Sequence, residues 1–238
     1  MKRLTGASEL LDGALDDPLT LAGNLRDLRR INRLLGGVTL SRLGLERLAG
    51  PTADGGGTVT MIDVGTGGAD IPAALLSDWS RRGRRLQVTA VDQRAEVLAA
   101  ARLARPALDR LRGLTLQVAD GLALPYRTGA FDVAHASLVL HHFEPRDAVA
   151  LLRELGRVSR RGVVVNDLAR GRLNWLGAWL VSHVVSGNRY TRHDAPLSVR
   201  RAYTLHEAHG LLAAAGLRTV AQALGPGGHR WALVAVAE

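Results

Sequence analysis

The chain has 238 residues and a formal net charge of +9, and 47% of its residues are hydrophobic. This length fits one large α/β domain, and the apolar fraction suffices for a sizeable core. The sequence contains no cysteine, which excludes disulfides, thiolate metal sites and cysteine nucleophiles.

The positive charge comes almost entirely from arginine, because Lys2 is the only lysine. Surfaces that bind phosphate usually use both residue types, so the bias favours a compositional origin and we expect no stable nucleic-acid complex. The amino-terminal stretch shows no secretory signal. The longest apolar helical run, residues 173–185, is shorter than the about 20 residues that a membrane helix needs. These features predict a cytoplasmic protein without a transmembrane segment.

Residues 1–57 precede the first predicted strand and are expected to form a helical cap. Apolar residues recur with helical spacing over residues 21–35, and this segment ends at Gly36-Gly37. A second helix is predicted over residues 40–48, and residues 51–57 form a glycine-rich linker.

From residue 58 onward, strand-like and helix-like segments alternate. The predicted strands are residues 58–64, 86–91, 114–118, 131–140 and 162–165. The predicted helices between them are residues 69–79, 95–107 and 146–158. Strands that alternate with helices of ten or more residues predict a Rossmann-like, doubly wound parallel sheet.

The end of the chain departs from this alternation. A helix over residues 205–215 precedes two strand-like segments, 219–224 and 229–236, which the loop Gly225-Pro226-Gly227-Gly228 joins. So short a glycine loop predicts an antiparallel hairpin. We therefore expect an α/β fold with a seven-stranded, mostly parallel sheet and a carboxy-terminal antiparallel hairpin. Residues 58–238 would form this domain, with a helical insertion at about 169–203.

A glycine-rich loop, Asp63-Val64-Gly65-Thr66-Gly67-Gly68-Ala69-Asp70, joins the first predicted strand to its helix. Its glycines permit a tight turn and close approach to a ligand. Asp70 takes the place of the third glycine of a dinucleotide motif, and no lysine lies nearby, so neither that motif nor a Walker motif is present. An acidic residue at this point suits a ligand with a cationic amino group.

Two further acidic residues end neighbouring strands. Asp92, followed by Gln93, ends the second predicted strand, where a carboxylate can accept hydrogen bonds from both hydroxyls of a ribose. Asp120, followed by Gly121, ends the third, where a carboxylate can accept the exocyclic amine of adenine. Ligands of open α/β sheets bind at this edge of the sheet.

These segments, with Phe131-Asp132-Val133 and Leu140-His141-His142 of the fourth strand, resemble the motifs of class I S-adenosylmethionine-dependent methyltransferases. The resemblance covers about residues 58–238, and one departure is Gly68-Ala69 in place of the usual third glycine spacing. It implies S-adenosylmethionine as the cofactor: the loop would hold its methionine part, Asp92 the ribose and Asp120 the adenine. The implied cofactor site comprises Asp63, Gly65, Thr66, Gly67, Gly68, Asp70, Asp92, Gln93, Asp120, Gly121, Ser137 and Leu138.

Several acceptor classes lack their characteristic residues. The Asn/Asp-Pro-Pro-Tyr/Phe motif of adenine-methylating enzymes is replaced by His135-Ala136-Ser137-Leu138, and cytosine C5 chemistry needs a cysteine. Protein arginine methylation uses paired glutamates where only Glu144 occurs. Asn166-Asp167 ends the fifth strand, but Ser137 stands where a further acid would be needed, so no metal is expected.

The insertion is the most individual part of the chain. Its run from Leu173 to Val181 is apolar on nearly all sides, so it either packs against the amino-terminal helices or lines a hydrophobic acceptor pocket. Trp175 and Trp179 lie four residues apart on one helix face and are predicted to line that pocket. With residues 21–35, which carry Arg26 and Asn32, the insertion is expected to close over the cofactor and bind the acceptor.

Four residues are candidates for a general base that deprotonates a hydroxyl: His141, His142, His193 and Asp194. Each of them alternatively has a structural role, with the rate supplied by proximity. The stretches 24–32 and 192–198 more loosely resemble bacterial methyltransferases found beside polyketide synthases. We therefore expect methyl transfer to a small, largely apolar acceptor with a phenolic or polyketide-like hydroxyl. The alternatives are C-methylation of a quinone-like ring, RNA methylation, and a non-enzymatic binding module.

Overall fold

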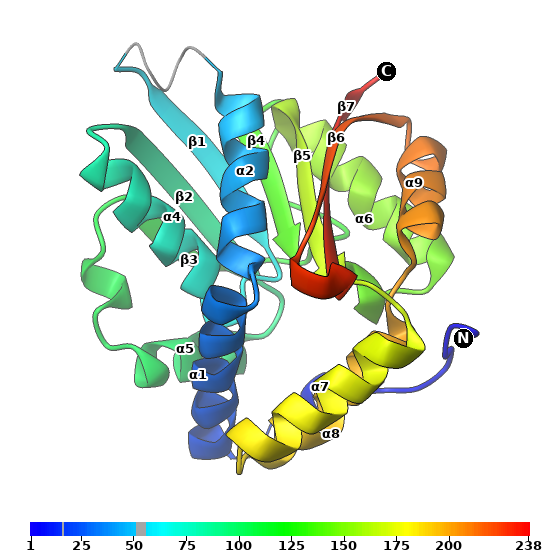
Figure 1. Ribbon diagram of the computed structural model, residues 1–238. Coiled ribbons are helices and arrows are strands. Elements are labelled where there is room, and N and C mark those ends of the chain that lie inside the picture. Colours follow the sequence, from blue (N-terminus) through cyan, green and yellow to red (C-terminus); the bar gives the residue numbers. More distant parts are fainter. Residues whose placement is uncertain (16, 51–55) are drawn as a thin grey trace.

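Seven strands form one sheet in the order β3-β2-β1-β4-β5-β7-β6 (Figure 1). The strands are Thr58–Val64 (β1), Arg85–Asp92 (β2), Leu114–Val118 (β3), Phe131–Ser137 (β4), Ser159–Leu168 (β5), Leu217–Leu224 (β6) and Arg230–Ala237 (β7). The first five pair in parallel, whereas β7 is antiparallel to both β5 and β6. The predicted Rossmann-like, mostly parallel sheet with a terminal hairpin is thus confirmed. Strand β7 lies between β5 and β6 and is antiparallel to both, so of these seven strands it is the one that runs in the opposite direction.

The computed structural model describes residues 1–15, 17–50 and 56–238. Of the predicted linker, residues 51–55 lie outside the described residues. The helices are Pro18–Leu34 (α1), Gly37–Ala49 (α2), Asp70–Arg81 (α4), Ala95–Ala104 (α5), Pro145–Val158 (α6), Arg172–Val185 (α7), Arg189–Arg201 (α8) and Leu205–Ala214 (α9). In the described part of the chain, none of them is both long and apolar enough to cross a bilayer.

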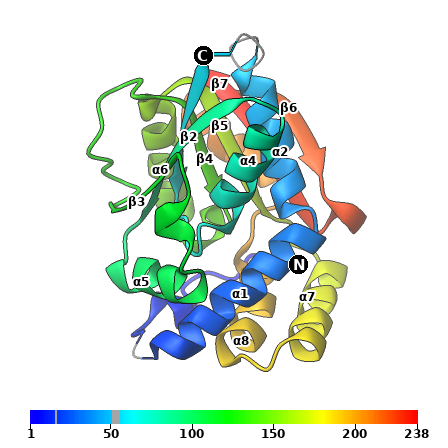
Figure 2. The same ribbon diagram turned by 90° about the vertical axis from the view of Figure 1, so that its left-hand side faces the viewer.

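Helices cover both faces of the sheet (Figures 1 and 2). On one face α2 and α4 pack against β1, β2 and β5 through a buried cluster that includes Leu45, Leu75 and Trp79. On the other face α6 and α9 bury Leu151, Leu155 and Leu212. This coverage explains why the central strands are apolar on both sides.

Helix α2 lies directly on the sheet because one of its residues has no side chain. A Cβ atom at Gly44 would come within 2.5 Å of Cγ1 of Val164 in β5, so a larger residue would push the helix outward. The amino-terminal region therefore contributes one helix to the sheet's own core, and α1 extends beyond it.

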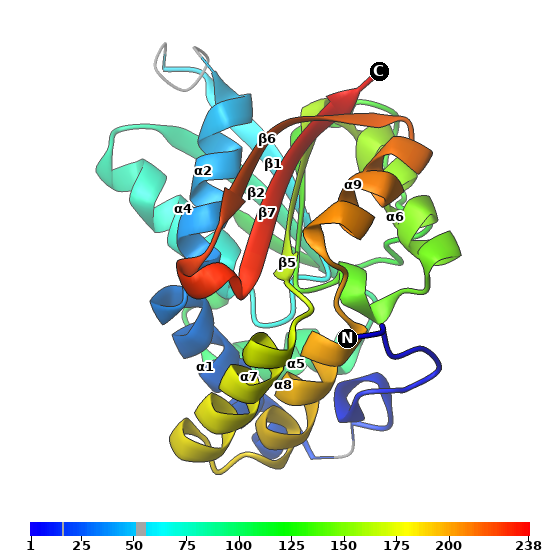
Figure 3. The ribbon, with the colours of Figure 1, turned by 45° about the vertical axis from the view of Figure 1, so that its right-hand side comes forward.

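A second layer lies beyond the carboxyl ends of the strands. Helices α1, α7 and α8 lie side by side there (Figure 3). Asp17 caps α1, accepting a hydrogen bond from the backbone nitrogen of Thr20 at 3.0 Å, and Pro18 occupies the first turn. The helix thus begins three residues before the apolar periodicity does. Left-handed Gly36, with φ 82°, ends it and turns the chain into α2.

Two local predictions need correction. The strand predicted over residues 131–140 ends at Ser137, because Leu138 adopts φ 58° and leads into a 3₁₀ turn, Leu140–His142 (η3). Helix α8 lies within the helical insertion predicted over about residues 169–203, but its own bounds were not predicted, since Pro196 and many polar residues interrupt its helical pattern. Asn188 caps it by accepting hydrogen bonds from two backbone N–H groups.

Candidate active site

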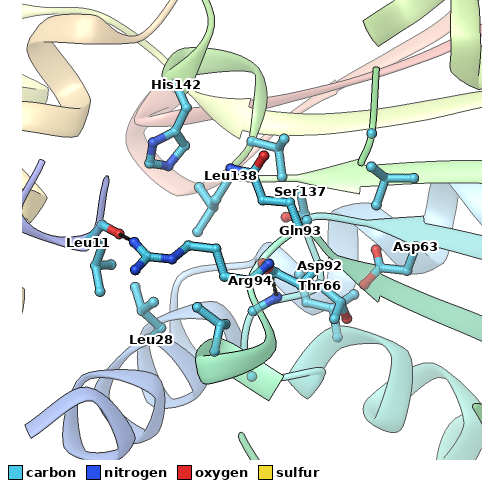
Figure 4. Close-up of a pocket in the computed structure, with 18 of the residues that line it drawn as sticks. Leu11, Leu28, Asp63, Thr66, Asp92, Gln93, Arg94, Ser137, Leu138 and His142 are labelled. Atoms are coloured by element: carbon cyan, nitrogen blue, oxygen red, sulfur yellow. Dashed lines mark hydrogen bonds between the residues drawn. The ribbon is translucent and has the colours of Figure 1, made fainter. Parts of the chain in front are cut away.

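A cavity of about 270 Å³ opens at the carboxyl ends of β1, β2 and β4, and Figure 4 shows its interior. We call it the first cavity. Its lining includes all the predicted cofactor residues but one: Asp63, Gly65, Thr66, Gly67, Gly68, Asp70, Asp92, Gln93, Gly121, Ser137 and Leu138. It lies where the strand order reverses between β1 and β4, which is the usual binding position in open α/β sheets.

The glycine loop keeps this cavity open. Gly65 has φ 68°, and a Cβ atom there would lie 2.4 Å from Cγ2 of Val139, so no other residue fits without displacement. Gly67 also has a positive φ, and Asp70 opens α4 immediately after the loop. Burial raises the pKa of Asp70, whose Oδ2 accepts a hydrogen bond from Nδ2 of Asn32 at 3.1 Å.

Asp92 points back toward the loop from the end of β2. Its two oxygens accept hydrogen bonds from the backbone nitrogens of Gly67 (3.0 Å) and Arg94 (3.1 Å), and burial raises its pKa.

Asp120, the residue predicted to bind adenine, does not lie in the first cavity. This residue is exposed, its Oδ1 accepts from the backbone nitrogen of Leu122 at 2.9 Å, and it does not line the cavity. Edge strand β3 is mostly exposed, so its end gives Asp120 little cover.

Two buried hydroxyls in the first cavity lack a partner among the described residues. They are Oγ1 of Thr66 and Oγ of Ser137, on the glycine loop and at the end of β4. A buried hydroxyl without a hydrogen bond is costly. Both groups therefore fit a polar ligand of the first cavity, which has the open glycine loop beside it.

A second cavity of about 300 Å³ adjoins the first on the side of α1, α7 and α8. The two share four lining residues: Leu11, Leu28, Leu138 and His142. The rest of the second lining is largely apolar and includes Ile31, Leu35, Leu173, Ala178, Val181 and Val199. A ligand in one cavity would thus face a ligand in the other across these four residues.

Two histidine rings pack against each other at this junction, with centroids 4.3 Å apart and an interplanar angle of 32°. His142 places Nδ1 3.0 Å from Oδ1 of Asp12, and its Nε2 lies 3.9 Å from Oε2 of Glu9. His141 is buried, and its Nδ1 lies 2.7 Å from Oδ1 of Asp167. Each ring therefore has a carboxylate that can hold it in one tautomer.

Burial shifts the pKa of Glu9 far from its ordinary value. Desolvation raises the pKa of this side chain to about 7, against the opposing pull of His142. Asp12 behaves in the opposite way: burial works against ionisation, but hydrogen bonds from His142 and Arg201 hold its pKa below the usual value. The Arg201 guanidinium lies 2.7 Å from Asp12 and 3.4 Å from Glu9.

The ligand atoms of Glu9, His141 and His142 lie within 4.8 Å of one another, a spacing that would suit a metal ion. A cation already stands beside this group, because Arg201 contacts the Glu9 carboxylate and also donates to the backbone oxygen of His142 at 2.8 Å. The three side chains are therefore part of a network of ion pairs and hydrogen bonds that also includes Arg201 and Asp12.

The other predicted bases lie differently. His193 is half-exposed, lines neither cavity, and places Nδ1 2.7 Å from Oδ1 of Asp194. Asp194 does line the second cavity, but its oxygens accept hydrogen bonds from the backbone nitrogens of Leu10 (2.8 Å) and Leu11 (3.1 Å). Its carboxylate thus anchors the amino-terminal segment that carries Leu11 to the junction.

The predicted acceptor residues also need revision. Trp175 and Trp179 are 36% and 42% exposed and lie outside the cavity lining. Helix α7 lines the second cavity with another stripe, which includes Asn174, Ala178 and Val181. These positions are rotated from the tryptophans by about a quarter turn, as helical spacing dictates. Arg26 is exposed and lines neither cavity, and Asn32 lines the first.

Three residues of the site escaped sequence analysis. Arg94 reaches across the first cavity and donates to the backbone oxygens of Leu11 (3.0 Å) and Gly13 (2.6 Å), as Figure 4 shows for Leu11. Its position two residues after Asp92 was an available signal. Glu9 and Arg230 had none, because they lie in an irregular segment and in a hairpin strand.

Comparison with known proteins identifies the domain. Residues 62–165 match a family model described as a methyltransferase domain. A search of curated proteins finds no match to the chain. One similar solved structure is a SAM dependent methyltransferase from Aquifex aeolicus, with 17% identity, a TM-score of 0.62, and coverage of 92% of this chain and 97% of that chain.

Two further similar structures are longer than this chain. An O-methyltransferase family 2 protein from Planctomyces limnophilus, in complex with apigenin, has 18% identity, a TM-score of 0.67, and coverage of 94% of this chain and 63% of that chain. Human N-acetylserotonin methyltransferase, in complex with SAM, has 17% identity, a TM-score of 0.67, and coverage of 98% and 60%. At such identities the likeness shows a common fold. Residues 62–165 thus match a methyltransferase domain, and the chain shares its fold with S-adenosylmethionine-dependent methyltransferases, which assigns S-adenosylmethionine as the cofactor.

Proposed function

We propose that the protein methylates a hydroxyl of a small, largely apolar acceptor, phenolic or polyketide-like, which binds in the second cavity. The observation that carries this proposal is the shared boundary of the two cavities at Leu11, Leu28, Leu138 and His142. Methyl transfer requires the donor and the acceptor atom in line and in contact, and this junction is where such contact is available.

The cofactor supplies an electrophilic methyl group on a sulfonium when it is bound. In the proposal, Asp92 binds the ribose hydroxyls, and the glycine loop takes the methionine part beside Asp63 and Asp70. The unpartnered hydroxyls of Thr66 and Ser137 gain their hydrogen bonds from it. Asp63 already has one partner, Nδ1 of His135, which fixes its orientation at the end of β1.

In the proposal, three helices shield the acceptor from water. Helix α1, from the predicted amino-terminal cap (residues 1–57), and helices α7 and α8, from the predicted insertion (residues 169–203) of the predicted methyltransferase domain (residues 58–238), line the second cavity. They contribute aliphatic side chains such as Leu28, Ile31 and Val181 to a lining whose surface is mostly apolar, which suits an aromatic or polyketide ring system. Such an enclosure also protects the sulfonium from hydrolysis.

His142 is the proposed general base. If its Nδ1–H donates to Asp12, which is held ionised, Nε2 remains as a proton acceptor at the junction. Nε2 would take the proton of the acceptor hydroxyl, and Asp12 would stabilise the resulting imidazolium. In the proposal, His141, buried against Asp167, positions His142 through the contact between their tilted rings.

The names of similar structures support an oxygen acceptor. They include the O-methyltransferase family 2 protein in complex with apigenin and a mitomycin 7-O-methyltransferase, MmcR. The latter has 19% identity and a TM-score of 0.58. These names concern those proteins, and for this chain they favour the hydroxyl over the ring carbon.

The test begins with the acceptor. The protein is incubated with methyl-labelled cofactor and a cell extract, which is then split into lipid-soluble, RNA and protein fractions. We expect label in the lipid-soluble fraction as a methyl ether; label in RNA, or a new carbon–carbon bond, would contradict the proposal.

The base is then tested on the labelled acceptor. His142→Ala should lower kcat by about 10²-fold or more and remove the acid limb of the pH–rate profile, because no group then needs to be deprotonated. His193→Ala is the matched control and should leave both unchanged, since His193 lines neither cavity. An acid limb that survives in the His142 variant would remove this residue from the mechanism.

A further inference from the structure

An arginine with unused hydrogen-bond donors lies in the second cavity. Arg230, the first residue of β7, is 1% exposed, and its Nη1 donates to Oδ1 of Asn32 at 2.9 Å. Its Nε and Nη2 are buried and have no hydrogen-bond partner in the described part of the chain. Unpaired donors on a buried charged group are costly, so they call for a ligand that accepts from both.

The side chain is held in place from behind. A Cβ atom at Gly37 would lie 2.0 Å from Nη1 of Arg230, so the absence of a side chain there makes room for the guanidinium. Asn32 then fixes Nη1 by its hydrogen bond. The guanidinium is therefore fixed in place, with Nε and Nη2 left without a protein partner in the described part of the chain, and the residue lines the second cavity.

These two donors define the shape of the missing partner. The Nε–H and one Nη2–H of a guanidinium lie parallel along one edge, at the spacing of the two oxygens of a carboxylate. Burial lowers the pKa of Arg230 to about 10, and the carboxylates of Asp167 and Asp70 oppose the fall, so the group stays charged at neutral pH. Neither acid lies in hydrogen-bond contact with it among the described residues.

A carboxylate could come from the acceptor or from the methionine part of the cofactor. Arg230 lines the second cavity and is not part of the first cavity's lining. Asn32 stands between it and the cofactor side, with its amide oxygen toward Arg230 and its amide nitrogen toward Asp70. This arrangement favours the acceptor as the source.

We propose that Arg230 binds a carboxylate of the acceptor, so that the substrate is a hydroxylated aromatic or polyketide-like carboxylic acid. The inference rests on the proposed function, which it narrows. The apolar lining takes the ring system, His142 faces the hydroxyl, and Arg230 holds the acid group. Neutral phenols of the same size would leave the guanidinium edge unpaired and bind more weakly.

The experiment compares an acid with its neutral ester. Binding of 3-hydroxy-2-naphthoate and of its methyl ester is measured by calorimetry with S-adenosylhomocysteine present. We expect the acid to bind the wild-type protein about tenfold more tightly or better, as a charge-assisted bidentate contact implies. Equal affinities, or no measurable binding of either probe, would overturn the inference.

Variants identify the group responsible. Arg230→Met should abolish the preference for the acid, and Arg230→Lys, which keeps the charge and is the safer variant for folding, should reduce it. Arg170→Met is the matched control, because Arg170 is a half-buried arginine that pairs with Glu207 outside both cavities, and it should keep the preference.

Two further readouts separate the possible failures. A loss of S-adenosylhomocysteine affinity in Arg230→Lys, with the acid preference intact, would assign the carboxylate to the cofactor and overturn the inference. Methyl transfer to neutral phenols without any preference for acids would also overturn it, while leaving the proposed function standing.

Discussion

Replacement of Glu9 by glutamine tests the electrostatics of the second cavity, because it changes how the stability of the protein depends on pH. Glu9 is 4% exposed, and desolvation raises its pKa from 4.5 to about 7. Between these values the folded protein binds more protons than the unfolded chain, so stability should fall as pH rises from about 4.5 to 7 and stay low above it. This interval corresponds to about 3 kcal/mol of unfolding free energy.

The assay is urea unfolding of the wild-type protein and Glu9→Gln at pH 5 and pH 8. Glutamine keeps the shape and does not ionise, so the loss of stability between the two pH values should be smaller in the variant by about 2.5 kcal/mol. Glu96→Gln, at an exposed position on α5, is the control and should follow the wild type. If the wild type and Glu9→Gln lose the same unfolding free energy between pH 5 and pH 8, the raised pKa of Glu9 is refuted.

Two predictions concern the ligands directly. Asp92→Ala should weaken S-adenosylmethionine binding by about 1–3 kcal/mol in calorimetry, the cost of losing charge-assisted hydrogen bonds, and unchanged affinity would remove Asp92 from the cofactor site. Ala178→Leu fills part of the second cavity and should raise the KM for the acceptor in steady-state kinetics. The double variant Trp175→Ala/Trp179→Ala, on the outer face of α7, should leave this KM unchanged. The reverse pattern would place the acceptor outside the second cavity.

The sheet and its glycine loop were predictable because their signals are local. Buried parallel strands appear as short apolar runs, and a turn that must bring the backbone near a ligand requires glycine at positions such as Gly65 and Gly67. Asp92 follows from the same logic, since the end of a predicted strand fixes its place at the ligand-binding edge. Asp120 does not follow this pattern: it comes after the mostly exposed edge strand β3, is itself exposed and does not line the first cavity.

The second cavity was not predictable in the same way because its contacts join distant parts of the chain. Glu9 and Arg201 are 192 residues apart in sequence, and Arg94 holds Leu11 from 83 residues away. Nothing in the irregular segment before α1 carries a periodic pattern that would indicate these partners. Helix α7 is apolar on most sides, so the sequence does not indicate which face turns inward; the position of α1 and α8 decides it.

The amide of Asn32 links a residue of the first cavity, Asp70, to a residue of the second, Arg230, so binding in the two cavities should be coupled. Its oxygen accepts from Arg230 and its nitrogen donates to Asp70, so the amide cannot rotate to serve one cavity without breaking its bond to the other. A ligand that draws Arg230 toward itself therefore alters the environment of Asp70, and a ligand at Asp70 alters that of Arg230. Such coupling is reciprocal: the factor by which the cofactor changes the affinity for the acceptor equals the factor by which the acceptor changes the affinity for the cofactor.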